Sequence, residues 1–248
     1  MEYLSKSLWK YRKKYGIDFV VANGENASEP NGIDKSTAES LFDCGVDVIT
    51  TGNHIWRKSG VFSYLDDKDE ILRPLNFPSA NPGHGDVIAK TPGGYKILVM
   101  NVLGEFYMES CASPYESIEK CLERNAGRYD LAILDIHAES TGEKKALAYN
   151  FADRVSIIYG THTHVQTSDA QVLGGCGYIT DLGMCGDNDS ILGVKKEAVI
   201  HKMKTKMMAK FDFATDGEIE CTGAIFEINT NTYRCDACYG VKFTGEIL

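Results

Sequence analysis

The sequence predicts an α/β protein, because short apolar runs typical of buried strands alternate with helical patterns up to about residue 164. Residues of metal-ligating type follow four of these runs, and α/β proteins bind ligands beyond the carboxyl ends of their strands. After residue 164 the pattern changes to short segments divided by glycine, which is typical of antiparallel strands in a second sheet. A chain of 248 residues is expected to form one domain over 1–248.

The elements up to residue 103 are predicted from the spacing of apolar residues and from residues that start or stop helices. Leu4 and Leu8 lie on one face of a first helix. Asp34 is a suitable N-cap for a second helix, and Gly45 would end it. The expected elements are helices over 2–15 and 35–43, a short helix near 58–66, and strands over 17–22, 46–50, 86–90 and 96–103.

The elements after residue 103 follow the same rules. Pro114 is expected in the first turn of a helix, where its missing N–H leaves no hydrogen bond unmade. Two apolar strands separated by a helix come next, and shorter segments follow. The expected elements are helices over 115–126, 142–151 and 194–204, and strands over 130–136, 155–159, 170–173, 177–181, 209–215, 219–228 and 240–247.

The composition narrows the range of partners. The net charge of −9 argues against a surface that binds long nucleic acid. It is compatible with a small phosphorylated substrate, because a metal ion can supply local positive charge. No apolar stretch approaches the roughly 20 residues that span a bilayer, and the amino terminus lacks the layout of a signal peptide. We therefore expect a cytoplasmic protein that does not bind membranes, and self-association into a homo-oligomer stays open.

Eight cysteines do not indicate a disulfide framework here. Cys44, Cys121 and Cys176 lie in or beside predicted helices and turns of a chain without an export signal, so buried free thiols are expected. Cys235 and Cys238 form a CxxC motif, but a paired zinc site needs a second such motif at suitable spacing, and the sequence has none. We therefore favour two incidental thiols in a late hairpin over a redox site.

Four polar clusters, each placed after an apolar run, are the main evidence on function. Carboxyl ends of parallel strands meet at one edge of a sheet, so clusters that are distant in sequence are expected to converge. Four of the six histidines belong to these clusters. The clusters are Asn23-Gly24-Glu25-Asn26, Gly52-Asn53-His54, His137-Ala138-Glu139 and Gly160-Thr161-His162-Thr163-His164.

The residue types in the clusters predict a site for divalent metal ions. Imidazole with carboxylate and amide oxygen suits Mn, Fe, Zn or Ni rather than calcium. Five donors are more than one tetrahedral ion needs, and a pair of ions roughly 3.5–4 Å apart would clamp a phosphoryl group for attack by an activated hydroxide. The five donors are Glu25, Asn53, His137, His162 and His164.

For residues next to the candidate ligands, a catalytic or supporting role is less strongly indicated by the sequence. His54 follows a ligand but is expected to point elsewhere, as a free imidazole at the rim that protonates the departing oxygen. Asp135 shares a strand face with His137, so it either orients that ligand or has no role. For Asp181 a turn cap is favoured over contact with a ligand histidine, and Glu139 is interpreted as the start of a helix.

Each candidate also has an ordinary explanation when it is taken alone. Asn53 could form a turn after a strand, and Glu25 could be an exposed loop carboxylate. His137 could be a hydrogen-bonded histidine at a strand end. The shared placement at four strand ends favours the metal site over these separate explanations.

The clusters resemble the YmdB-like branch of the calcineurin-type metallophosphoesterases. The resemblance rests on the four clusters and on the intervening segments, and it covers nearly the whole chain. It implies a four-layer α/β/β/α sandwich, a dinuclear centre of Fe or Mn (with Zn or Mg as alternatives), and phosphodiesterase activity that includes 2′,3′-cyclic nucleotides. The highly specific match is Gly160-Thr161-His162-Thr163-His164-Val165-Gln166-Thr167. The intervening segments that also match are Leu72-Arg73-Pro74 and Tyr178-Ile179-Thr180-Asp181-Leu182-Gly183-Met184.

The resemblance also implies a role for each site residue. Glu25 would bridge the metals, Asn53, His137 and His162 would complete one ion, and His164 with Asn26 would hold the other. His54 would be the proton donor.

One part of the family pattern has no counterpart in this sequence. The family opens with a strand that ends in Gly-Asp-x-x-Gly, whose aspartate binds the first metal. This sequence begins at what would be the following helix, so the fold is expected to lack that strand and the ion at His164 to be held weakly. We therefore expect a phosphodiesterase whose activity is impaired by weak binding of the ion at His164. The alternative is a non-catalytic regulatory protein that keeps the fold and a metal.

Overall fold

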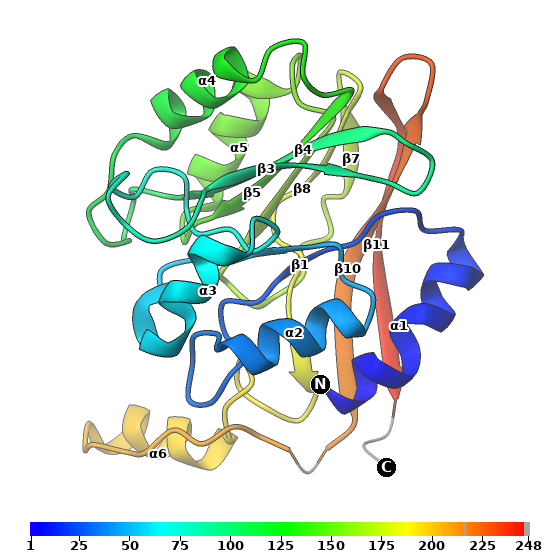
Figure 1. Cartoon of the computed structure of the whole chain (residues 1–248). Helices are drawn as coiled ribbons and strands as arrows, with labels where there is room; N and C mark the ends of the chain where they lie inside the picture. The colour runs from blue at the N-terminus through cyan, green and yellow to red at the C-terminus, as the bar shows by residue number, and fades with distance from the viewer. Residues whose placement is uncertain (216, 246–248) are drawn as a thin grey trace.

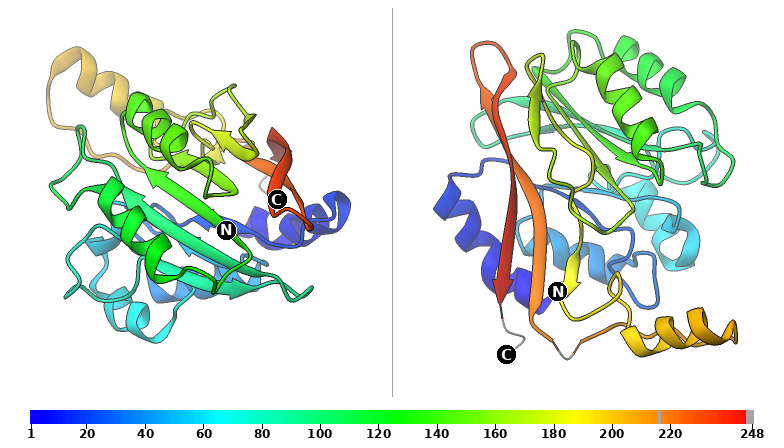
Figure 2. Two further views of the ribbon diagram at one scale, coloured as in Figure 1. Left: turned by 90° about the horizontal axis from the view of Figure 1, so that it is seen from above. Right: turned by 180° about the vertical axis from the view of Figure 1, so that it is seen from behind.

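The computed structural model describes residues 1–215 and 217–245, which form an α/β/β/α arrangement of four layers (Figures 1 and 2). Helices α4 (Pro114–Arg124) and α5 (Thr141–Phe151) cover one face of a six-stranded sheet. The other face of that sheet packs against two smaller sheets. Helices α1 (Glu2–Tyr15) and α2 (Lys35–Asp43) lie beyond them. The fold class expected from the sequence is confirmed.

The six-stranded sheet contains two of the four strands that carry site clusters. Its four inner strands are parallel, and its two edge strands pair antiparallel with their neighbours. In spatial order the strands are β3 (Asp86–Lys90), β4 (Lys96–Leu103), β5 (Leu131–His137), β6 (Ile157–Thr161), β8 (Cys176–Ile179) and β7 (Gln171–Leu173).

The smaller sheets form the second inner layer. Strand β1 (Val21–Asn23) pairs in parallel with β2 (Val48–Thr50). Strand β10 (Ile219–Asn229) pairs antiparallel with both β11 (Arg234–Gly245) and β9 (Cys185–Asp187). A second, antiparallel sheet was expected and is confirmed.

Several strand predictions need correction. The segments predicted over 170–173 and 177–181 belong to the large sheet as β7 and β8. The strand predicted over 209–215 is wrong, because only an isolated bridge from Phe213 to Val194 forms there. Strand β9 was not predicted, and β11 begins before residue 240, while positions 246 and 247 of the predicted strand lie outside the described residues.

The strand predicted over 17–22 begins only at Val21, because side chains hold the preceding backbone. The Arg12 guanidinium donates to the carbonyl of Asp18 (2.8 Å) and to the carboxylate of Asp47 (2.8 Å). The same carboxylate accepts the backbone N–H of Val20 (2.7 Å). In a strand these backbone groups would bond to a neighbouring strand, whereas here they bond to side chains. The same bonds hold α1 against the start of β1.

The predicted helices are confirmed, with one shortened. The helix near 58–66 consists of two 3-10 turns, Ile55–Arg57 and Ser59–Val61, followed by α3 (Phe62–Asp67). Asp34, Ser113 and Ser140 cap α2, α4 and α5 through their side-chain oxygens. Helix α6 (Lys196–Thr205) stands apart from the layers (Figure 1). In the described part of the chain, no helix is both long and apolar enough to cross a membrane.

Three apolar cores fill the spaces between the layers. Alternate residues of β5 serve different cores: Leu134 and Ile136 pack under α4 and α5. Leu131 and Ile133 face the smaller sheets. By the same alternation, Asp135 points between the two inner layers. This inner space holds the polar site described below.

The CxxC cysteines lie on the β10–β11 hairpin as expected, and all eight cysteines are free thiols. Burial raises the pKa of Cys238 to about 11 and also raises the pKa of Cys235. Neither thiol has the lowered pKa of a redox-active cysteine. The motif is a structural part of the hairpin.

Candidate metal centre

The candidate ligands come from two facing sheets rather than from the edge of a single sheet. Glu25 follows β1 and Asn53 follows β2, in the two-stranded sheet. His137 ends β5 and His162 follows β6, in the six-stranded sheet. The expectation of one common sheet edge is therefore corrected, whereas the four clusters do meet.

Glu25, His137 and His162 form the centre of the cluster. Each offers a ligand atom, and these atoms all lie within 4.8 Å of one another. Glu25 Oε1 is 3.2 Å from His137 Nε2, and His162 Nδ1 is 3.2 Å from the same nitrogen. Asn53 Oδ1 joins them at 3.1 Å from His137 Nε2. Glu25 and His137 are almost completely buried.

Gly52 allows His137 to reach this position. A Cβ atom at Gly52 would lie 2.3 Å from His137 Nε2, which is far inside van der Waals contact. The imidazole can therefore pack over the backbone that precedes Asn53 only because residue 52 has no side chain. This close approach explains the glycine in the Gly52-Asn53-His54 cluster.

Three further candidates extend the cluster on the side of Glu25. Asn26 Nδ2 donates to Glu25 Oε2 (3.0 Å) and lies 3.3 Å from His164 Nε2. His54 Nδ1 lies 3.0 Å from Asn26 Oδ1, and the His54 backbone N–H donates to Glu25 Oε1 (3.0 Å). The half-buried His54 ring is thus part of the cluster, which corrects the expectation that it points elsewhere.

Asp135 connects the two inner layers directly behind the candidate ligands. Its fully buried carboxylate accepts hydrogen bonds from Asn23 Nδ2 of β1 (3.2 Å) and Thr50 Oγ1 of β2 (2.6 Å). It also accepts the hydroxyl of Thr161 of β6 (2.7 Å). Burial raises the pKa of Asp135, and these hydrogen bonds oppose that shift. The carboxylate that could not be assigned from sequence therefore supports the site.

The Asp135 contact fixes the tautomer of His137. A hydroxyl has one proton, and Thr161 gives its proton to Asp135. The contact of 3.0 Å between Thr161 Oγ1 and His137 Nδ1 must therefore be an N–H donated by the imidazole. In neutral His137 this leaves the lone pair on Nε2, which faces Glu25, Asn53 and His162.

The loop that carries His162 and His164 has an uncommon backbone. The φ angle is 96° at His162 and 63° at His164, a region that residues with a Cβ rarely occupy. Asp181 holds the residue between them, because its Oδ2 accepts both the N–H (3.2 Å) and the hydroxyl (2.7 Å) of Thr163. The fully buried Lys144 donates from Nζ to the same oxygen at 2.7 Å.

Asp181 performs both of the tasks that were weighed for it. Its Oδ1 accepts the N–H of Gly183 (2.9 Å), which is the expected turn cap, and its Oδ2 supports the histidine loop. Lys144 was not predicted, because a lysine inside a helical pattern ordinarily belongs to a solvated face. Glu139 is not the start of α5, which follows the cap Ser140; instead, its Oε2 lies 3.2 Å from His162 Nε2.

The surroundings of the cluster favour an ionised Glu25 carboxylate and a neutral His162 ring. Burial opposes the ionisation of Glu25, but when the His137 ring carries a proton on both nitrogens, its hydrogen bond and charge, with help from His54, lower the pKa of Glu25 to about 2. Burial lowers the pKa of His162, which favours the neutral ring that binds metals, and it also lowers the pKa of His54. The nearby Glu25 carboxylate opposes both histidine shifts.

The donor set fits a divalent cation. The lone pair of His137 Nε2 faces a carboxylate oxygen, an amide oxygen and a second imidazole nitrogen, so electron-rich atoms converge on one point. A cation placed among them would turn this repulsive arrangement into coordination. The second carboxylate oxygen, Glu25 Oε2, accepts from Asn26 Nδ2, which also contacts His164 Nε2.

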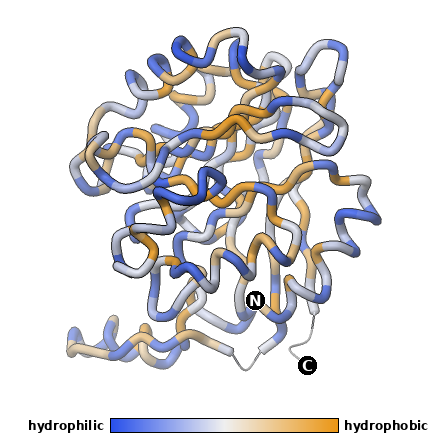
Figure 3. Tube along the Cα trace, viewed as in Figure 1, coloured by the Kyte–Doolittle hydropathy of each residue, from blue (hydrophilic) through white to orange (hydrophobic). Residues whose placement is uncertain are grey.

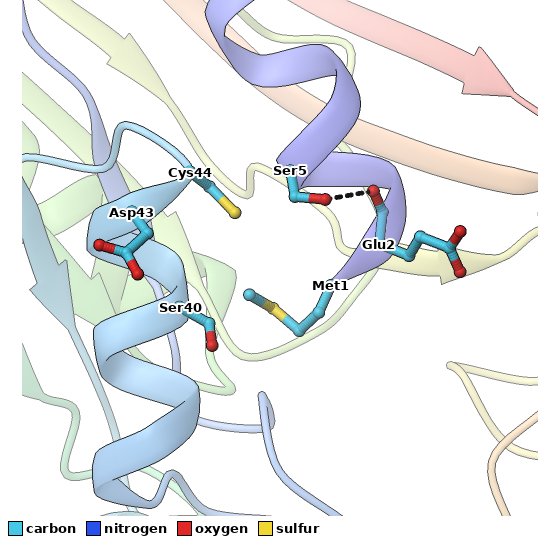
Figure 4. A pocket seen from close by; sticks show the side chains of 6 residues that line it. All are labelled: Met1, Glu2, Ser5, Ser40, Asp43 and Cys44. Carbon is cyan, nitrogen blue, oxygen red and sulfur yellow. Dashed lines mark hydrogen bonds between the residues drawn. The ribbon is translucent and has the colours of Figure 1, made fainter.

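A separate hollow of about 340 Å³ lies between α1 and α2 (Figure 4). None of the residues that line it belongs to the metal cluster. The lining residues are Met1, Glu2, Ser5, Ser40, Asp43 and Cys44. The hollow is therefore separate from the candidate metal ligands.

The four layers and the Glu–His cluster between the sheets define a metallophosphoesterase fold of the calcineurin type. The profile of the YmdB-like proteins matches residues 1–240, and the chain belongs to the YmdB-like family. The resemblance inferred from the sequence motifs is thereby confirmed.

Three similar proteins place the chain within that family. A protein of Bacillus subtilis named 2′,3′-cyclic-nucleotide 2′-phosphodiesterase is 37% identical over 226 residues, which are 91% of this chain and 85% of that protein. A crystal structure of a hypothetical protein from Thermus thermophilus is 33% identical, with a TM-score of 0.88 over 99% of this chain and 94% of the other. A structure described as a novel phosphatase of Mycoplasma pneumoniae is 29% identical, with a TM-score of 0.90 over 98% and 88%.

Proposed function

We propose that this protein is a metal-dependent phosphodiesterase that hydrolyses small phosphodiesters such as 2′,3′-cyclic nucleotides. The convergence of Glu25, His137 and His162 between two sheets is the observation that carries the proposal. The name of the Bacillus subtilis relative supports a cyclic nucleotide as the substrate class. The net charge of −9 fits a small substrate better than long nucleic acid.

In this proposal the cluster holds two divalent ions, with Fe or Mn favoured by the mixed nitrogen and oxygen donors and Zn or Mg as alternatives. Asn53, His137 and His162 hold one ion, and Asn26 and His164 hold the other. Glu25 presents one carboxylate oxygen to each group. When bound, the ions would neutralise phosphoryl charge and acidify a water molecule for in-line attack.

The chain's own residues orient these groups. Asp135 and Thr161 keep the lone pair of His137 directed into the site. His54 is proposed as the proton donor to the departing oxygen. Its Nδ1 is engaged with Asn26, and among the described residues its Nε2 makes no hydrogen bond, so Nε2 is the atom proposed to meet the substrate.

A metal-binding protein without turnover is the competing hypothesis. Within the described ranges, only Glu25, His137 and His162 form a group of three ionisable donors. At His164 the neighbouring group is the neutral amide of Asn26, which in turn donates to the Glu25 carboxylate. A single tightly held ion would favour a regulatory role over two-metal hydrolysis.

The decisive experiment measures turnover of 2′,3′-cyclic AMP with added Mn²⁺ beside metal content per chain. We expect His137→Ala to lose both bound metal and activity, because it removes the central nitrogen. We expect His54→Ala to retain metal and lose activity by about 10²–10⁴-fold, the usual contribution of a general acid. His84→Ala, an exposed histidine paired with Asp69, is the matched control and should retain both.

Bound metal without turnover in the wild-type protein would contradict the phosphodiesterase and favour the regulatory protein. Equal activity of wild type and His54→Ala would refute the assigned proton donor alone.

A further inference from the structure

Helix α6 is the only helix of ten or more residues in the described chain without a buried residue. None of its residues is buried, and residues 200–208 are all exposed. Figures 1 and 2 show it projecting from the layers in views from both sides. A helix of 10 residues is too short to be stable in water by its own hydrogen bonds. Its fold therefore indicates a packing partner.

The surface of this segment is apolar as well as exposed. We call residues 195–211 the basic arm. Apolar and polar residues alternate along it, as Figure 3 shows, and Met208 is 92% exposed. Methionine-rich surfaces adapt to a partner and are typical of binding sites. The exposed apolar residues of the arm are Ile200, Met203, Met207, Met208 and Phe211.

The arm is strongly basic within an acidic protein. It contains six lysines and one glutamate, which gives it a net charge of +5. Because the whole chain has a net charge of −9, the remainder of the chain has a net charge of −14. Lys196 and Lys210 pair with Asp189 and Asp212 at the base of the arm. Lys202 lies over the ring of Phe211, 4.9 Å from its centroid. The arm therefore fits an acidic surface that also offers apolar contacts.

Such a surface exists on the same chain, in the loop between β4 and α4. We call residues 105–109 the acidic–aromatic loop. It places Phe106 (60% exposed) and Tyr107 (90% exposed) between Glu105 and Glu109, which are exposed as well. Aromatic rings and carboxylates are the complements of methionine and lysine.

The acidic–aromatic loop is held rigidly enough to serve as a docking surface. The Glu143 carboxylate accepts the N–H of Glu105 (2.8 Å) and of Phe106 (3.4 Å). Asn76 pairs with the backbone of Ala112 just beyond the loop, in both directions. Ordering this loop therefore adds little entropic cost to binding.

We propose that the basic arm docks on the acidic–aromatic loop of a second copy of this chain. Both surfaces lie at the side where the parallel strands end (Figure 1). Every chain carries both surfaces, so a two-fold axis would form the contact twice. The contact would also border the metal cluster, because the backbone carbonyl of Leu192, just before the arm, lies 3.4 Å from His164 Nδ1.

The first test is the oligomeric state, measured by sedimentation velocity at micromolar concentrations of the full chain. We expect a wild-type dimer that Met203→Glu with Met207→Glu weakens by more than about tenfold, because buried anchor side chains dominate such contacts. Phe106→Ser with Tyr107→Ser should have the same effect. Tyr149→Ser is the matched control, since this ring on α5 is 69% exposed but lies outside both surfaces.

The second test reverses the charges. Lys202→Glu with Lys204→Glu should weaken the dimer, and adding Glu105→Lys with Glu109→Lys to the same chain should restore it. Circular dichroism checks that each variant is folded. A wild-type monomer at all concentrations, or a dimer unaffected by the arm variants, would overturn the proposal. A dimer lost in the first charge variant and not restored in the second would overturn the assigned loop.

This inference depends on exposure, packing and charge, and not on the proposed phosphodiesterase activity. A monomeric protein that is active would refute the docking contact and leave the enzyme intact. A dimeric protein without turnover would do the reverse.

Discussion

Thr163 connects the candidate ligands to the core of the protein. It lies between His162 and His164, and its hydroxyl and N–H both donate to Asp181. Because the two histidines have positive φ angles, the loop would relax if these bonds were lost. Lys144 forms a buried ion pair with Asp181, so this pair supports the loop of the candidate ligands His162 and His164.

Thr163→Ala should lower the affinity for Mn²⁺ by about 10–100-fold, the usual cost of removing a hydrogen bond that orients a ligand. Thr163→Ser keeps the hydroxyl and should retain most of the affinity. Calorimetric titration with Mn²⁺ measures both, and thermal unfolding separates loss of affinity from loss of fold. Unchanged Mn²⁺ affinity in Thr163→Ala would show that the loop holds its shape without Asp181.

The candidate ligands are easier to identify from the sequence than the residues that hold them in place. Candidate ligands are visible because histidine, asparagine and glutamate follow apolar runs at strand ends. Lys144 and Thr161 carry no such signal, because a lysine in a helix and a threonine in a strand have ordinary explanations. Their roles depend on side-chain contacts across elements, which spacing along the chain does not encode.

Helix α2 depends on its N-cap. Asp34 Oδ1 accepts the N–H of Thr37 (2.9 Å) and the hydroxyl of Ser36 (2.7 Å). These contacts, led by the Thr37 N–H, lower the pKa of Asp34 to about 2 from an ordinary value of 3.8. The cap is therefore strongest when the carboxylate is ionised.

Asp34→Ala should reduce the free energy of unfolding by about 1 kcal/mol at neutral pH, as loss of an N-cap does. The folded pKa is depressed, so the contribution is complete above pH 3.8 and is lost as the pH falls through about 2. The difference between wild type and variant should shrink over that window in urea unfolding. Asp34→Asn keeps an acceptor oxygen and should retain most of the stability at neutral pH. A difference that does not change with pH would contradict the charged cap.

Helices and long strands were predictable because their signals are local. The helices over 2–15 and 35–43 and the strand over 96–103 appear with their predicted bounds. The predicted strand over 209–215 failed because strand propensity alone cannot show whether a neighbouring strand is available. The partition into sheets failed for a related reason, since β7 and β8 have antiparallel features but continue the large sheet.

At the scale of the whole molecule, the distance between the two inner layers sets the geometry of the site. Glu25 and Asn53 belong to one layer, and His137 and His162 to the other. The core between the layers keeps them at contact distance, and Ile133 of β5 lies in that core. This arrangement was implied by the family resemblance, while the strand pattern alone predicted a single sheet edge.

Ile133→Ala and Leu134→Ala provide a matched pair on β5. Each removes a buried aliphatic side chain and should destabilise the fold by about 2–5 kcal/mol. Only Ile133 faces the space between the sheets, whereas Leu134 packs under the outer helices. We therefore expect Ile133→Ala alone to lower the Mn²⁺ affinity of the folded protein, by about tenfold, because small misplacements of ligands are costly. Calorimetry below the unfolding transition measures this, and equal affinities in the two variants would show that the ligands keep their positions independently of the core between the sheets.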